Sequence, residues 1–138
     1  MPTLLSTTVQ TLLLCANIYT ARAPDLGAQW AGVCIEVAER ASLTTVRPSL
    51  AVAVAWHESR LRRDVVGALG EVGPMQVRPE MHCDGYCADP IGAGLVVLAR
   101  YVEEHGEDNG MCRYRGAPAG CRSPRVALAD RIDPGAGR

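Results

Sequence analysis

The segment between Pro48 and Leu61 constrains the fold more than any other part of the chain. Before His57 it contains little but apolar residues: Leu50, Val52, Val54, Ala55 and Trp56. A helix that is apolar nearly all round has to be covered on every side. Pro48 suits the first turn of such a helix, where its missing N–H costs no hydrogen bond. We therefore expect a helix from Pro48 to about Leu61 at the centre of the domain.

Further helices are expected around this central one. Their apolar residues recur at helical spacing over these stretches: 29–41, 91–105, a short one near 111–114, and 125–132. Glycine and proline punctuate 67–79, which favours loops or short strands. The chain has 138 residues, 48% of them hydrophobic. It is therefore expected to form one mainly α domain with minor β over 25–132, followed by a disordered tail over 133–138.

Residues 1–24 are open to two interpretations. The run Leu12–Ala16 is apolar, and Ala21-Arg22-Ala23 resembles the cleavage site of a secretory signal. No basic residue precedes the apolar run, however, and the run is too short to span a bilayer. The segment is either a cleaved signal peptide or a buried N-terminal helix.

The cysteines indicate an oxidising compartment. Four of the six cysteines form two local pairs: Cys83 with Cys87, and Cys112 with Cys121. Such clustering favours disulfides. A zinc site that adds His82 and His105 is the alternative, but the gaps do not follow the usual C-x-x-C spacing. Cys15 and Cys34 form a third bridge or stay as buried thiols. We expect a periplasmic or extracellular protein without a bound metal.

Composition and motifs argue against several functional classes. The net charge is −1, so no global positive field favours nucleic acid, although all 14 basic residues are arginine. The chain also lacks a phosphate-binding loop, a G-x-G-x-x-G fingerprint and an H-E-x-x-H pair. We therefore expect neither an organic cofactor nor a nucleic-acid partner.

Glu58 is the residue on which a catalytic interpretation depends. It lies near the end of the apolar helix, and burial disfavours the charged form of a carboxyl group. A neutral carboxylic acid can donate a proton to a leaving group. The alternative is a surface glutamate paired with Arg62 or Arg63. Only a second motif can decide between the two.

That second motif follows Glu58-Ser59 without insertion or deletion. The stretch 67–79 reads GALGEVGPMQVRP, and together the two motifs resemble the signature of the lytic transglycosylases, E-S followed by G-A-x-G-L-M-Q-x-x-P. Members of this family share a lysozyme-like fold of the goose type. Fainter likenesses lie at Asp89-Pro90-Ile91 and at Arg113-Tyr114-Arg115-Gly116, so the resemblance covers roughly Leu50 to Val126.

The resemblance implies a reaction on the glycan strands of peptidoglycan. Glu58 would be the single acid and base that cleaves the bond after N-acetylmuramic acid and leaves a 1,6-anhydro product, without a cofactor. Met75 and Gln76 would line the groove and contact the N-acetylated sugar, and Tyr114 would approach Glu58. Ser59 belongs to the same substrate-binding set, although a helix-end role suits it better than that of a nucleophile. The protein would act as a monomer, alone or within a phage particle or wall-spanning assembly.

Some positions depart from the family pattern. Gly67 replaces a substrate-contacting Ser, Glu71 a small residue, Pro74 a Leu and Arg115 an Asn. Two other functions therefore stay open. One is a goose-type muramidase, a hydrolase that would need water and a second carboxylate, for which Asp64, Asp84 and Asp89 are candidates. The other is a non-catalytic wall-binding protein on the same scaffold.

Overall fold

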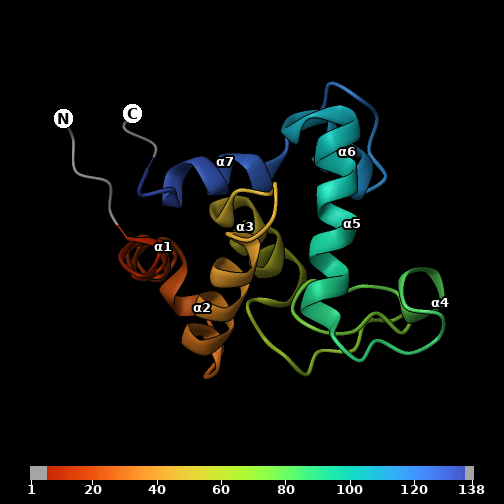
Figure 1. Ribbon diagram of the computed structural model, residues 1–138, viewed down its shortest axis with the longest axis horizontal. Coiled ribbons are helices and arrows are strands. Elements are labelled where there is room, and N and C mark those ends of the chain that lie inside the picture. Colours follow the sequence, from red (N-terminus) through yellow and green to blue (C-terminus); the bar gives the residue numbers. More distant parts are fainter. Residues whose placement is uncertain (1–5, 136–138) are drawn as a thin grey trace.

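A computed structural model describes residues 6–135, and within this range the protein is mainly helical (Figure 1). Its helical segments are α1 (Thr7–Arg22), η1 (Ala23–Asp25), α2 (Trp30–Ala41), α3 (Pro48–Ser59), α4 (Pro79–His82), α5 (Pro90–His105), α6 (Glu107–Tyr114) and α7 (Pro124–Ile132). The mainly α class is confirmed. The expected β content shrinks to two isolated antiparallel bridges, Val66 to Val72 and Val72 to Val77.

Helix α3 lies at the centre, as its apolar composition predicts. Every residue from Ser49 to Trp56 is buried, and α2 and α7 pack against it. The helix ends at Ser59, two residues before the expected end. Arg60 and Leu61 both take a left-handed conformation, with φ of 58° and 61°. This turn ends the helix and returns the fully buried Leu61 to the core.

The N-terminal segment is part of the same core. Helix α1 packs against α2 and α7 and buries Leu14, Cys15 and Ile18. A disulfide joins Cys15 to Cys34 of α2, which settles the open choice for these two residues. In the described residues, 7–22 therefore form a packed helix. Whether it is also cleaved stays a prediction, and residues 1–5 lie outside the described range.

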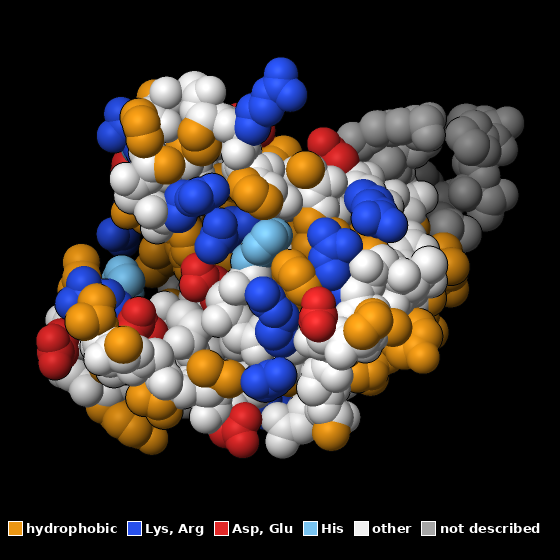
Figure 2. Space-filling view, turned by 180° about the vertical axis from the view of Figure 1, so that it is seen from behind, with side chains coloured by type: hydrophobic (Ala, Val, Ile, Leu, Met, Phe, Trp, Pro, Cys, Tyr) orange, Lys and Arg blue, Asp and Glu red, His pale blue; other side chains and the backbone are white. Residues whose placement is uncertain are grey.

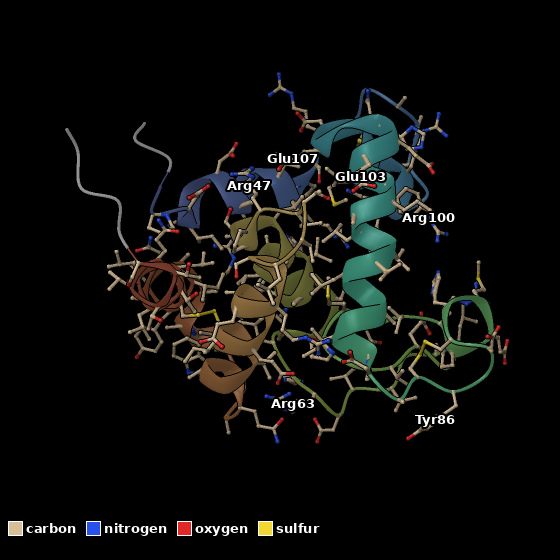
Figure 3. The ribbon with its side chains drawn as sticks, in the orientation of Figure 1. Arg47, Arg63, Tyr86, Arg100, Glu103 and Glu107 are labelled. Atoms are coloured by element: carbon tan, nitrogen blue, oxygen red, sulfur yellow. A yellow bond between two sulfur atoms is a disulfide. The ribbon has the colours of Figure 1, made fainter. Side chains whose placement is uncertain are left out.

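One arginine ties the ends of three elements together. Arg47, just before α3, forms ion pairs with Glu107 of α6, Asp130 of α7 and Asp133 (Figure 3). The expected disordered tail therefore does not begin at Asp133, which is anchored by its carboxylate. The last three residues, 136–138, lie outside the described range.

The remaining elements stand beside this bundle. Helix α5 packs against α6, and the irregular stretch 60–89 runs past its lower end in Figure 1. Helix α6 begins at Glu107, earlier than expected, because Glu107 and Asp108 provide an acidic first turn that suits the positive end of a helix. In the described residues no helix is long and apolar enough to cross a membrane.

Both predicted local disulfides are present. Cys83 forms a disulfide with Cys87 in the loop after α4, and Cys112 of α6 forms one with Cys121 in the loop that follows this helix. The zinc alternative therefore loses its cysteine ligands, and residues 6–135 contain no cluster of three metal-binding side chains. Three disulfides are typical of a protein from an oxidising compartment.

Candidate functional site

A cleft of about 290 Å³ opens where the end of α3 faces the loop 71–78 and helices α4, α5 and α6. Its lining residues are Glu58, Glu71, Gln76, Val77, Arg78, Met81, His82, Val97, Tyr101 and Tyr114. Seen from behind, the surface is hollowed between two lobes, and acidic side chains lie in the hollow with arginines along its border (Figure 2). The cleft thus brings together Glu58, Gln76 and Tyr114, three of the predicted site residues.

Ser59 joins the two sequence motifs to each other. Its Oγ lies 2.7 Å from the carbonyl oxygen of Pro74 and accepts a hydrogen bond of 3.2 Å from the N–H of Arg62. The residue is only 5% exposed. Ser59 therefore fixes the end of α3 against the 73–75 turn, and its hydroxyl does not face the cleft.

The turn at 73–76 separates two neighbouring side chains that the resemblance assigned to one task. Gln76 has φ of 52° and lies in the cleft lining, where its Nε2 donates to the carbonyls of Val65 and Gly73 at 2.8 and 2.9 Å. Met75 instead is fully buried and lies against Gly94 of α5. This corrects the prediction for Met75, which is buried and does not line the cleft.

Tyr114 reaches the cleft from α6. Its hydroxyl donates to the carbonyl of Met75 at 3.2 Å, and its ring packs edge-on against Tyr101 at 5.7 Å. Burial raises the pKa of Tyr114, and the nearby charge of Glu58 adds to this effect. Tyr114 is therefore a neutral phenol that can donate a hydrogen bond but cannot act as a base near pH 7.

Glu58 has an ionic partner that the sequence did not reveal. Its Oε1 lies 3.0 Å from Nη2 of Arg125, and the two side chains are 23% and 12% exposed. The sequence predicts either an apolar environment for Glu58 or an ion pair with Arg62 or Arg63. Both predictions are corrected, because Glu58 has a charged partner and that partner is Arg125. Arg63 pairs with Glu36 instead.

Helix ends explain why this pair forms. Glu58 lies in the last turn of α3, where the helix dipole disfavours a negative charge, and Arg125 lies in the first turn of α7, where it disfavours a positive one. Their contact compensates both. An acid role for Glu58 therefore requires that its side chain leave Arg125 and turn to the substrate.

A second carboxylate lies in the same cleft. Glu71 Oε1 accepts a hydrogen bond of 2.7 Å from the N–H of Leu69. A Cβ at Gly67 would approach this oxygen to 2.7 Å and Gln76 Oε1 to 2.9 Å. Glu71 thus occupies space that Gly67 leaves open. The sequence offered other acids for this role, among them Asp89, which instead caps α5 and pairs with Arg40.

Comparison with known proteins adds no relative to these observations. No family model, no curated protein and no solved structure matches the chain. The functional interpretation therefore depends on the sequence resemblance and on the geometry of the cleft.

Proposed function

We propose that this protein is a lytic transglycosylase that cleaves the glycan strands of peptidoglycan, on a helical scaffold of the lysozyme-like type. One observation carries the proposal. Glu58, Gln76 and Tyr114 come from three separate segments of the resembled signature, and all three line one cleft. The three disulfides agree with action in the periplasm or outside the cell.

The cleft supplies the groups that this reaction needs. Glu58 protonates the glycosidic oxygen after an N-acetylmuramic acid unit, and the bond breaks with positive charge developing on the sugar. The carboxylate left behind then removes the proton of that sugar's C6 hydroxyl, which closes the 1,6-anhydro ring. The hydroxyl oxygen of Tyr114, whose hydrogen is donated to Met75, and the Oε1 of Gln76 can accept hydrogen bonds that orient the sugar beside Glu58.

Digestion of purified peptidoglycan tests the proposal. The wild-type protein is expected to release fragments with 1,6-anhydro ends, detected by mass spectrometry. Glu58→Gln is expected to lower the rate by a factor of roughly 100 or more, the usual contribution of a general acid. Glu80→Gln, an exposed change on nearby α4, is the control and should leave the rate unchanged. Full activity of Glu58→Gln would refute the site assignment.

The position of Glu71 favours a second candidate, a muramidase that hydrolyses the same bond. A second carboxylate in the lining of the same cleft as Glu58 can activate a water molecule in place of the C6 hydroxyl. Reducing ends that carry one added water would then replace the anhydro ends. Glu71→Gln separates the candidates, because it should stop hydrolysis and leave the transglycosylase reaction largely intact. Binding to insoluble peptidoglycan without any cleavage would instead favour a wall-binding protein.

A further inference from the structure

Buried nitrogen atoms without hydrogen-bond partners gather beside Glu58. Within residues 6–135 there are three such side-chain atoms: Trp56 Nε1, His57 Nε2 and Arg125 Nε. The Trp56 and His57 rings meet edge-on at 4.9 Å, and the charge of Arg125 acts directly on His57. Native proteins satisfy nearly all buried polar groups, so a group of unsatisfied ones calls for a ligand or ordered water.

Two further guanidinium groups lie over the same tryptophan. The Cζ atoms of Arg60 and Arg22 lie 4.1 Å and 4.8 Å from the centre of the Trp56 ring. Their hydrogen bonds go to backbone carbonyls, those of Trp56 and His57 for Arg60 and that of Ala21 for Arg22. Neither forms an ion pair with an acidic side chain of the described part of the chain.

The cluster therefore carries more positive than negative charge. Arg22, Arg60 and Arg125 contribute three positive charges, and Glu58 contributes the one acidic contact. Burial first, and then the charges of Arg125 and Arg60, lower the pKa of His57 to about 4. His57 is thus neutral near pH 7, and because the ring already bonds to the backbone of Pro124, it adds no positive charge and no further donor to the cluster. On the face shown in Figure 2, arginine side chains gather around one histidine.

We propose that Arg22, Arg60 and Arg125 form an anion subsite next to Glu58 that binds a carboxylate carried by the substrate. The inference rests on the proposed function, because Arg125 links the cluster to the cleft. Guanidinium groups match the two oxygens of a carboxylate. Peptidoglycan presents carboxylates at two places: on the lactyl group of N-acetylmuramic acid in bare strands, and on the stem peptides in substituted strands.

Occupation of this subsite has a consequence for Glu58. A carboxylate that shares Arg125 competes with the Glu58 side chain for the same guanidinium. This competition frees the Glu58 side chain from its ion pair, and a general acid must be free to approach the glycosidic oxygen. The substrate would thus loosen the ion pair, and neutral glycans would bind weakly and react slowly.

Binding of three tetrasaccharides tests the subsite. The probes are the N-acetylglucosamine tetramer, which is neutral, and muramic-acid-containing tetrasaccharides with and without stem peptides. The protein carries Glu58→Gln so that no probe is cleaved, and affinities come from titration calorimetry. At least one carboxylated probe is expected to bind about tenfold more tightly than the neutral one, as a charge-assisted hydrogen bond would provide. The tighter of the two identifies which carboxylate is bound.

Matched variants show whether the cluster causes the difference. Arg60→Gln should remove most of the preference for the carboxylated probe, and Arg60→Lys should keep part of it. Arg131→Gln, an exposed arginine of α7, removes the same charge elsewhere and should leave the preference intact. If Arg60→Gln does not fold, Arg22→Gln takes its place. Raising the salt concentration from 0.05 to 0.5 M should also weaken only the carboxylated probes.

The outcomes separate this inference from the proposed function. Equal binding of neutral and carboxylated probes, or an equal loss in Arg131→Gln, would overturn the subsite even if the wild-type protein cleaves peptidoglycan. Arginine-dependent binding by a protein that never cleaves would uphold the subsite and reject the transglycosylase activity.

Discussion

The ion pair between Glu58 and Arg125 should be stronger than a shorter pair elsewhere in the same chain. Arg125 Nη2 lies 3.0 Å from Glu58 Oε1, and the two side chains are only 12% and 23% exposed. Arg63 Nη1 lies 2.7 Å from Glu36 Oε1, but these side chains are 45% and 38% exposed. By distance alone the Arg63–Glu36 pair would be the stronger of the two, whereas by burial the Arg125–Glu58 pair would be the stronger.

The expected strength of each ion pair follows from how far water screens its charges. At an effective dielectric constant of about 20, two charges 3 Å apart attract by roughly 5 kcal/mol, and desolvation offsets much of this. We expect a coupling free energy of about 2 kcal/mol for Glu58 with Arg125. Water screens the exposed Arg63–Glu36 pair, for which we expect about 0.5 kcal/mol.

Two double-mutant cycles measure both couplings. Each cycle combines glutamine substitutions, Glu58→Gln with Arg125→Gln and Glu36→Gln with Arg63→Gln. The free energy of unfolding of each variant comes from urea titration at pH 7 with the disulfides intact. A coupling for Arg63–Glu36 as large as that for Arg125–Glu58 would refute the reasoning, because exposure would then not control the strength of these pairs.

Three further predictions concern single features of the structure. The pKa of His57 is lowered from 6.5 to about 4, so the unfolded state takes up a proton first as the pH falls. Between pH 6.5 and 4 the wild type should lose about 1–2 kcal/mol more stability than His57→Gln in urea titrations, a value reduced because the ring is half-buried; equal losses would contradict this. Gly67→Ala should lower the free energy of unfolding in urea titrations by about 1 kcal/mol, because the new Cβ displaces the Glu71 carboxylate from its hydrogen bond. The same substitution should lower it by less in a protein that already carries Glu71→Ala. Replacing Cys15 and Cys34 by serine should lower the unfolding free energy by roughly 3 kcal/mol, as expected for a bridge with a sequence separation of 19, and an unchanged urea midpoint would argue against it.

The sequence predicts those parts of the fold that depend on local apolar patterns. The absence of a polar face predicts a central place for helix α3, and apolar spacing predicts α2, α5 and α7. Helix α1 was harder to place, because exposed Leu12 and Leu13 lie beside buried Leu14 and the helix has no clear apolar stripe. Its place in the core depends on contacts with α2 and α7, which the local sequence of α1 does not indicate.

The candidate site shows where pattern stops being informative. A motif gives the identity of Met75 and Gln76 but not their directions, and the left-handed φ of Gln76 turns the two side chains to opposite sides. The partner of Glu58 lies 67 residues further along the chain, on a helix whose own pattern only predicts packing. No local signal marks Arg125, because the contact exists only once α7 lies against the end of α3.

Two departures from the resembled signature, Gly67 and Glu71, depend on each other in the structure. A side chain at position 67 would meet the Glu71 and Gln76 oxygens at less than 3.0 Å, so a serine there is incompatible with the present place of Glu71. A glycine at 67 and a glutamate at 71 therefore belong together, because the Glu71 carboxylate fills the space beside Gly67. A carboxylate only accepts hydrogen bonds, whereas a serine hydroxyl both donates and accepts them, so this part of the cleft lacks the donor that a serine would provide. If the cleft binds a glycan as proposed, the combination should change which sugar hydroxyls it recognises there and leave Glu58 in place.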